Sequence, residues 1–442
     1  MYAHVKVACG MDPGGNVMRK VSLRSFLRGT LFATVVGLVG LGALQCFASG
    51  SNFAPVQKRI RHVFIITLEN KSYDDSFGSS TQDPYLVNTL RPMGALLTHY
   101  YATGHVSLDN YIAMISGQSS SKQTEADCIS YDDFRMTGIA PDGQAVGDGC
   151  VYPPRIKTLP DQLKRAGLTW RGYMEDMGND PARESSVCGH PALNTKDPTQ
   201  LPEAPSSSVP TGDQYAGRHN PFIYFHSIID SADCSASVVN LSKLDADLVA
   251  LTSTPNFVFI TPNLCNDGHD GDGTGAQGKG CVTGQPGGLA SSDLLLRTWV
   301  PKILASAAYQ SDGLLIITFD ESNFATLSKN VDASTGHTTV TATYSGEACC
   351  NQQIGPNVVR PATAIFPVNV NLTYRLVLTG VGGDRIGAVL ISPFIRPGTV
   401  SNVPYNHYSM LKSLEDIFGL RPLGYAAQPA LASFGPDVYT SP

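Results

Sequence analysis

Five short apolar runs constrain the fold of this chain more than any other feature of its sequence. They are Val63–Leu68, Thr169–Met174, Asn256–Thr261, Leu314–Phe319 and Ile386–Ser392. Their apolarity is continuous rather than alternating, which is typical of strands buried on both faces. Such strands occur in parallel sheets covered by helices. The sequence therefore predicts an α/β fold with a mostly parallel central sheet flanked by helices.

Helical segments are expected between these strands, which is the alternation typical of α/β proteins. They are predicted at 109–116, 157–166, 240–251, 291–308 and 407–419. Two stretches rich in Pro, Gly, Ser and Asp, 196–215 and 265–290, are expected to be long loops. Because no repeat or linker divides the chain, we expect a single domain over residues 55–425 and a C-terminal tail at 426–442.

Composition excludes several classes of protein. The chain has 442 residues, of which 42% are hydrophobic and 15% are charged, so it is too apolar to be disordered. Its 31 Lys and Arg against 37 Asp and Glu give a net charge of −6. Because no basic cluster accompanies this charge, nucleic acid is not an expected partner.

The N-terminal region has the pattern of an export signal. Basic residues between Arg19 and Arg28 precede an uncharged run, Gly29–Leu44, and small residues follow it. The run is short for a spanning helix, so we expect a cleavable signal over residues 1–48 and no stable membrane span after cleavage. The predicted location is periplasmic or secreted.

Eight cysteines remain beyond this signal, and an even number in an exported chain indicates disulfides. No CxxC pair is present, which argues against a thiolate metal site. Proximity in the sequence favours Cys128–Cys150 and Cys265–Cys281 as pairs, and the adjacent Cys349 and Cys350 are candidates for a vicinal bond.

Polar residues follow three of the predicted strands at their carboxyl ends. They are Glu69 and Asn70, Asp320 and Glu321, and the group Asn263, Asp267, His269 and Asp270. Any one of these is ordinary, because acids after strands usually cap helices or lie in solvated loops. In an open α/β sheet, however, all three groups meet at one edge, which is where ligands bind. Carboxylate and amide oxygens suit a divalent cation.

Ser107 is a candidate nucleophile just before a predicted helix. Taken alone, a serine there is more often an N-cap. A helix N-terminus also favours an anion, and a nearby cation would lower the pKa of the hydroxyl. The chain contains no GxSxG elbow and no GxxxxGK[ST] loop, which argues against an α/β-hydrolase esterase and a P-loop nucleotide hydrolase.

Six segments, in order along the chain, resemble the bacterial phosphoesterase family of phospholipases C and metal-dependent acid phosphatases. The segments are Glu69–Gly78 (ENKSYDDSFG), Gly104–Tyr111 (GHVSLDNY) with Ser116–Gly117, Arg218–Phe222 (RHNPF), Thr261–Asp270 (TPNLCNDGHD), Thr318–Glu321 (TFDE) and His407–Asp416 (HYSMLKSLED). Two positions depart from the family pattern: Asn266 stands where histidine is frequent, and Arg218 stands where lysine is usual.

The resemblance implies an alkaline-phosphatase-like α/β core and a set of site residues. By motif position, one divalent metal ion (Ca, Mg, Mn, Zn or Fe) is expected at Glu69, Asn70, Ser107, Asp320 and Glu321. Ser107 would attack phosphorus, with His219, His269 and Asn110 holding the phosphate. His269 and His407 are further catalytic candidates, although His407 is equally well explained as a helix cap.

The expected function is that of an exported, metal-dependent phosphoesterase that works through a phosphoseryl intermediate. An acid-phosphatase-like phosphomonoesterase is favoured, because the chain lacks the added β-domains of the larger phospholipases C. The alternatives are a phospholipase C-type phosphodiesterase and a non-catalytic envelope protein that keeps the fold. The expected ligand is a small phosphate ester or a phospholipid headgroup, and the oligomeric state stays open.

Overall fold

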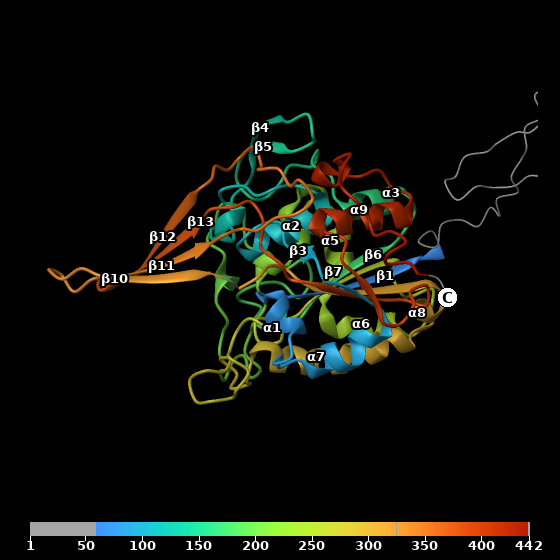
Figure 1. Ribbon diagram of the computed structural model, residues 1–442, viewed down its shortest axis with the longest axis horizontal. Coiled ribbons are helices and arrows are strands. Elements are labelled where there is room, and N and C mark those ends of the chain that lie inside the picture. The colour runs from blue at the N-terminus through green and yellow to red at the C-terminus, as the bar shows by residue number, and fades with distance from the viewer. Residues whose placement is uncertain (1–58, 324, 441–442) are drawn as a thin grey trace, which may run out of the picture. The chain divides into compact units, whose positions relative to one another are not determined.

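An eight-stranded central sheet organises the fold in the computed structural model, which describes residues 59–323 and 325–440 (Figure 1). The strand order is β15-β2-β14-β9-β1-β8-β6-β7. The strands are β1 (His62–Leu68), β2 (Ala95–Leu97), β6 (Trp170–Met174), β7 (Val238–Asn240), β8 (Phe257–Thr261), β9 (Gly313–Phe319), β14 (Ala388–Ile391) and β15 (Thr399–Ser401). The predicted export signal at 1–48 lies outside the described residues.

Most of this sheet is parallel, as predicted. Strand β1 pairs in parallel with both β8 and β9, and β6 pairs in parallel with β8 and β7. Every residue of β1, β8 and β9 is buried, which explains why these runs carry no polar alternation. The last of the five apolar runs differs, because β14 is antiparallel to both β9 and β2.

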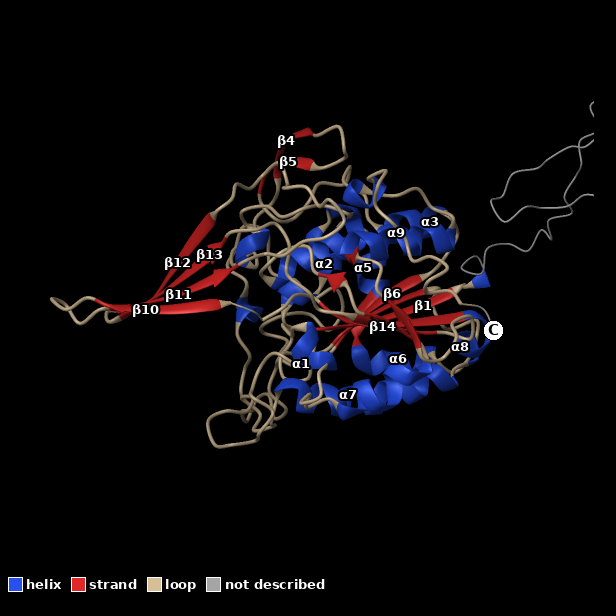
Figure 2. Cartoon of the chain, viewed as in Figure 1, coloured by secondary structure: helices blue, strands red, loops and turns tan. Residues whose placement is uncertain are grey.

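Helices cover both faces of the sheet (Figure 2). Helices α2 (Ser107–Ser116), α3 (Leu159–Arg165) and α9 (His407–Phe418) lie on one face, and α7 (Gly288–Ala305) lies on the other. The remaining short helices are α1 (Tyr73–Phe77), α4 (His226–Ile229), α5 (Ala232–Ser237), α6 (Leu244–Asp247) and α8 (Ala307–Asp312). Two predicted helices are corrected: 240–251 shrinks to α6 after a strand end, and 291–308 divides where Ser306 caps α8.

A second sheet, which the sequence analysis did not predict, extends away from the central one (Figure 1). Its strands, in the order β10-β11-β13-β12, are β10 (Thr326–Val331), β11 (Thr338–Tyr344), β12 (Ala362–Asn369) and β13 (Leu372–Leu378). Strand β11 alternates polar and apolar residues, β10 is mostly polar, and the apolar run of β12 contains Pro367, so these strands do not match the pattern used to find the core strands. We call this four-stranded sheet the arm.

Two small strand pairs lie outside the two sheets: β3 (Tyr100–Tyr101) with β16 (Tyr405–Asn406), and β4 (Arg135–Ile139) with β5 (Ala145–Asp148). The segment expected to be a C-terminal tail packs into the core through buried Phe434 and Val438. No helix within 59–323 and 325–440 has the length and apolarity needed to cross a bilayer.

Four disulfides link the eight cysteines of the described chain. They are Cys128–Cys150, Cys188–Cys234, Cys265–Cys281 and Cys349–Cys350. The three pairs favoured from the sequence are confirmed. The Cys265–Cys281 bond closes the long loop that follows β8, which carries Asp267 and His269.

Candidate active site

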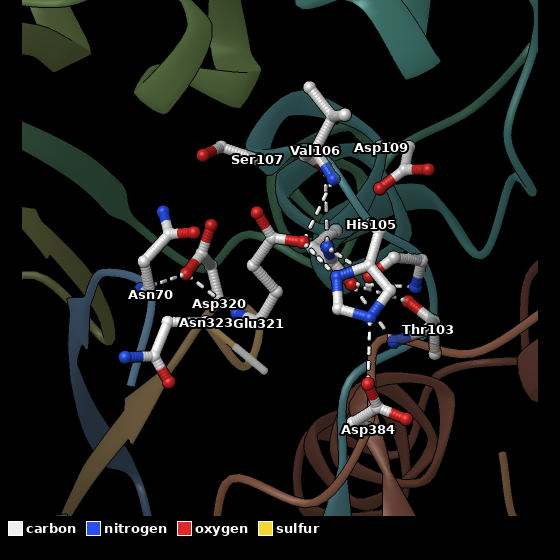
Figure 3. Close-up of polar contacts among 12 residues, drawn as sticks. Asn70, Thr103, His105, Val106, Ser107, Asp109, Asp320, Glu321, Asn323 and Asp384 are labelled. Carbon is white, nitrogen blue, oxygen red and sulfur yellow. Dashed lines mark hydrogen bonds and ion pairs between the residues drawn. The ribbon is translucent and has the colours of Figure 1, made fainter. Parts of the chain in front are cut away.

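The two acidic strand ends lie side by side at the carboxyl edge of the sheet. Strands β1 and β9 are in register up to Leu68 and Phe319, so the next residues, Glu69 and Asp320, leave the sheet together. The backbone N–H of Asn70 donates to Asp320 Oδ1 at 2.9 Å (Figure 3). Glu69 and Asp320 are both fully buried.

Ser107 joins this group from helix α2. Its hydroxyl donates to Glu69 Oε2 at 2.8 Å, and the amide of Asn70 donates to the same oxygen at 2.7 Å. Tyr111, one turn further along α2, donates its hydroxyl to Glu69 Oε1 at 2.7 Å. The carboxylate of Glu69 therefore accepts hydrogen bonds from the Ser107 hydroxyl, the Asn70 amide and the Tyr111 hydroxyl.

The N-cap interpretation of Ser107 is wrong. Helix α2 begins at Ser107 itself, and the cap position belongs to Val106, which makes no side-chain capping bond. Val106 has a φ of 86°, a strained backbone region for a β-branched residue. Its N–H is held by Glu321 Oε2 at 2.8 Å (Figure 3). The turn thus frees the Ser107 hydroxyl for Glu69.

The electrostatics of the site are dominated by a cluster of buried acidic side chains. Burial raises the pKa of Glu69 well above its usual value, and the charge of Asp320 raises it further. Burial likewise raises the pKa values of Asp320 and Asp267, with added repulsion from Glu321 and Glu69 respectively. Asp267 Oδ2 and Asp320 Oδ2 are buried without a hydrogen-bond partner. These oxygens are what a bound cation would satisfy.

The oxygen-rich residues suit a hard divalent ion, yet they are not arranged as a complete cage. Within the described ranges, no three His, Cys, Asp or Glu side chains converge as a metal site. Glu69 is occupied by hydroxyl and amide donors, and Glu321 turns one oxygen toward His105. The predicted ligand set of Glu69, Asn70, Ser107, Asp320 and Glu321 therefore stays a prediction.

His105 connects Glu321 to a distant part of the chain. Its Nδ1 lies 2.7 Å from Glu321 Oε2, and its Nε2 lies 2.9 Å from Asp384 Oδ2 (Figure 3). Burial lowers the pKa of His105, but the hydrogen bonds to Asp384 and Glu321 outweigh it and raise the pKa to about 9. The imidazole is thus a buried cation between two carboxylates. Because Glu321 precedes the arm and Asp384 follows it, this contact clamps both ends of the arm at the site.

Of the three predicted histidines, His219 contacts Glu69, whereas His269 and His407 contact other groups. His219 is buried, stacks on Tyr111 with ring centroids 5.4 Å apart, and places Nε2 3.4 Å from Glu69 Oε1. Both of its ring nitrogens lack a hydrogen-bond partner, and burial lowers its pKa. His269 is 47% exposed and pairs with Asp270.

His407 is buried behind the acidic pair. Its Nε2 lies 2.6 Å from the backbone oxygen of Asp320, and its Nδ1 lies 3.1 Å from the Tyr100 hydroxyl. Burial lowers its pKa to about 4, so the ring is neutral at physiological pH. The capping explanation is corrected, because the side chain of Asn406 caps α9. His407 instead supports the backbone at Asp320.

Asn110, predicted to contact phosphate, is committed to the turn before α2. Its Oδ1 accepts hydrogen bonds from the N–H groups of Thr103 and Gly104 at 2.8 and 3.0 Å, and its Nδ2 donates to Gly104 O at 3.0 Å. Both ends of the amide are therefore used in shaping the loop that carries His105 and Val106.

Sequence reasoning missed the roles of two residues that the fold brings to this site. Asp384 lies 279 residues from His105, in a loop with no motif, and no local signal points to it. Tyr111 does stand within the resembling segment at α2, and its position one helical turn after Ser107 was the available signal.

Two cavities flank the acidic pair. One, of about 440 Å³, is lined by residues that include Tyr73, Ser322 and Arg385. The other, of about 300 Å³, is lined by residues that include Lys71 and Asn323. Each cavity borders a residue next to the site rather than Ser107 itself, and each has room for a small phosphate ester.

The fold and the site place this chain in the class of α/β proteins whose polar site lies at the carboxyl ends of the sheet strands. More particularly, it belongs to the Phosphoesterase family, whose profile matches residues 80–421. A probable acid phosphatase of Kluyveromyces lactis is 26% identical over 286 residues, which are 64% of this chain and 53% of that protein. An acid phosphatase of Aspergillus fumigatus is 24% identical, covering 63% of this chain and 48% of that protein.

The chain thus spans about half the length of these curated relatives. A relative that matches along nearly its whole length is the phosphatidylinositol-3-phosphatase of Mycobacterium tuberculosis, 22% identical over 94% of this chain and 93% of that protein. Among solved structures, a protein in the alkaline phosphatase superfamily from Vibrio parahaemolyticus has a TM-score of 0.43 at 13% identity, covering 84% of this chain and 70% of that one.

Proposed function

We propose that this chain hydrolyses phosphate monoesters through a serine nucleophile. The observation that carries the proposal is the position of Ser107 at the N-terminus of α2, with its hydroxyl directed at the buried carboxylate of Glu69. Membership of the Phosphoesterase family and the similarity to proteins named acid phosphatase support it.

The residues account for the chemistry as follows. The Ser107 oxygen attacks phosphorus and forms a phosphoseryl ester, while the substrate alcohol leaves with the electrons of the broken P–O bond. Because the Ser107 proton already faces Glu69, its departure requires no rearrangement of the site. The positive end of α2 favours the phosphate anion at this position. Water then hydrolyses the phosphoseryl ester and releases inorganic phosphate.

The proposed reaction requires one divalent cation bound at the candidate active site. Glu69, Asn70, Asp320 and Glu321 would hold it, because a cation would offset the burial and mutual repulsion that raise the pKa values of Glu69 and Asp320, and Asp320 Oδ2 has no hydrogen-bond partner. Such an ion supplies positive charge for the phosphate oxygens and lowers the pKa of a nearby hydroxyl. Calcium, magnesium, manganese, zinc and iron all remain candidates for the site.

The proposed location is periplasmic or secreted. Four disulfides among the described residues support an oxidising compartment, and the export pattern at 1–48 agrees with it.

A lipid-linked phosphate ester is the second candidate substrate. It is favoured by the near full-length similarity to a protein named phosphatidylinositol-3-phosphatase. Phosphodiester cleavage of the phospholipase C type and loss of catalysis remain the competing functions. They differ in products, since a phosphatase releases inorganic phosphate and a phospholipase C releases a phosphorylated headgroup.

The deciding experiment measures release of the aryl alcohol from aryl phosphate monoesters and diesters, and release of phosphocholine from phosphatidylcholine, with and without a chelator. Ser107→Ala serves as the inactive control. We expect monoester hydrolysis that requires both the cation and Ser107. Hydrolysis of diesters alone would favour the phospholipase function, and no hydrolysis of any substrate by the metal-loaded protein would favour the binding protein.

A further inference from the structure

The arm has two chemically different faces. Cross-strand pairing places Leu327 opposite Ala342, and Ala342 opposite Leu376. Side chains two positions away along each strand share that face. The face therefore carries Leu327, Val331, Val340, Leu372, Tyr374 and Leu376, with the basic side chain of Lys329 between Leu327 and Val331. We call the six apolar residues the apolar face.

The opposite face of the arm is polar. Pairing places Ser328, Thr341 and Arg375 in one row across three strands. The neighbouring rows on that side are largely threonine and asparagine. Two aliphatic side chains stand among them: Ile365, opposite Arg375, and Val377, opposite Thr363. The arm is thus an amphipathic sheet rather than a uniformly polar extension.

The apolar face is open to solvent. Leu327 is 69% exposed, Val331 is 52% exposed and Tyr374 is 47% exposed. A sheet with one apolar face normally packs that face on a core, but the arm, a mixed sheet, extends away from the central sheet (Figure 1). A contiguous exposed apolar surface of this kind marks an interaction site.

Charge and position on the fold indicate what occupies this face. The four strands contain no Asp or Glu and two basic residues, Lys329 and Arg375, although the chain as a whole is acidic. At the base of the arm, Tyr344 is two residues from Ala342 and lies on the apolar face. The centroid of its ring is 4.3 Å from that of the His105 ring. His105 in turn contacts Glu321. The apolar face is therefore continuous with the candidate active site.

We propose that the apolar face of the arm docks on a lipid surface that contains anionic lipids. The aliphatic side chains enter the apolar layer, while Lys329, which lies on this face between Leu327 and Val331, meets the anionic headgroups. Because the face ends at Tyr344 and His105, docking brings headgroup phosphate esters toward Ser107. This last step rests on the proposed function, whereas docking itself does not.

The test is co-sedimentation of the full chain with vesicles of phosphatidylcholine, with and without added phosphatidylserine. We expect binding that is stronger with phosphatidylserine and that weakens as salt is added. The double variant Leu327→Ser/Val331→Ser should bind about tenfold or more weakly, because two exposed aliphatic anchors are lost. Both side chains are exposed, so the thermal unfolding temperature should stay at the wild-type value.

The matched control is Ile365→Ser, which removes an aliphatic side chain that is 62% exposed from the opposite face. It should bind vesicles as the wild type does. Equal binding by all three proteins, or an equal loss in both variants, would overturn the proposal. Self-association of the wild type without lipid that the double variant abolishes would also overturn it, because a second copy would then cover the face.

Phosphate release from a soluble aryl ester by the wild type separates the two proposals. Vesicle binding with the expected variant pattern, but without any phosphate release, contradicts the proposed function and supports docking. Phosphate release by the wild type, together with vesicle binding that is the same in the wild type and both variants, supports the proposed function and overturns docking.

Discussion

The Ser107 hydroxyl donates a hydrogen bond of 2.8 Å to Glu69 Oε2, joining the start of α2 to the end of β1 across 38 residues of sequence. The bond exists because Val106 takes the strained cap position and Ser107 becomes the first helical residue. A capping serine would have directed its oxygen at its own backbone. The hydroxyl instead faces the fully buried carboxyl group of Glu69.

Replacing Ser107 by alanine should abolish turnover and leave the fold intact. We expect the rate on an aryl phosphate monoester to fall by roughly 10³-fold or more, because the covalent route disappears. The free energy of unfolding should fall by only about 1 kcal/mol, the worth of one hydrogen bond. Steady-state kinetics and thermal unfolding measure the two effects.

Ser116→Ala is the matched control for this change. Ser116 is buried on the same helix, and its hydroxyl donates to Ile112 O at 2.6 Å and accepts from Gln118 N–H at 3.2 Å, so both of its partners are backbone groups. It should lose comparable stability and keep its activity. Acid-quench trapping of the phosphoenzyme should locate the label on Ser107, and a label on another residue would contradict the mechanism.

Replacing the carboxyl groups of Glu69 and Asp320 by amides should abolish the increase in thermal stability that a divalent cation gives the wild type. The wild type should gain thermal stability with a bound cation, by about 2.7 kcal/mol at a hundredfold excess over Kd. Glu69→Gln/Asp320→Asn should show no such gain. Without metal, the double variant should be at least as stable as the wild type, because two repelling buried carboxylates are gone.

The control for the cation response is Asp83→Asn, which neutralises a buried carboxylate outside the site. Burial raises the pKa of Asp83 to about 8, so it resembles Glu69 in environment. Its variant should keep the full cation response in calorimetry. A cation response in Glu69→Gln/Asp320→Asn equal to that of the wild type would contradict the predicted metal ligands.

Asp384→Asn should weaken the clamp at the base of the arm. The substitution keeps the size of the side chain but leaves the His105 imidazolium with one carboxylate, so we expect a loss of about 1–3 kcal/mol in unfolding free energy. kcat should also fall, because Glu321 is positioned by the same ring. Asp74→Asn, which breaks the solvent-exposed pair with neighbouring Arg385, should change neither quantity measurably.

Glu415 should make the folded state less stable as pH rises. Burial raises its pKa from 4.5 to about 9, so the folded chain holds a proton that the unfolded chain releases. Its contribution to stability is therefore greatest below pH 4.5 and declines between 4.5 and about 9. Glu415→Gln should remove this decline, because an amide does not titrate in this pH range. The amide oxygen can still accept the hydrogen bond from Leu423 N–H, so the substitution keeps that contact.

Denaturant unfolding at a series of pH values tests this prediction, with Asp416→Asn as the control at the adjacent, partly exposed position. The Glu415→Gln curve should rise above that of the wild type most clearly at neutral and alkaline pH. If the two proteins showed the same slope of unfolding free energy against pH, the buried proton would be assigned to the wrong residue.

Local sequence determined the features that need only a short stretch of chain. Continuous apolarity identified strands β1, β8 and β9, because burial on both faces leaves no room for polar alternation. Since the carboxyl ends of parallel strands meet at one edge, the pairing of Glu69 with Asp320 followed from their positions after β1 and β9. Proximity along the chain likewise anticipated Cys128–Cys150 and Cys265–Cys281.

Only the tertiary structure decided features that depend on how distant segments meet. The antiparallel direction of β14 follows from the path of the chain through the arm, and its apolar sequence is compatible with either direction. The contact of His105 with Asp384 joins residues 279 positions apart, which no spacing encodes. The amphipathic arm escaped prediction because its strands contact mainly one another, so their apolar residues form a surface instead of a core.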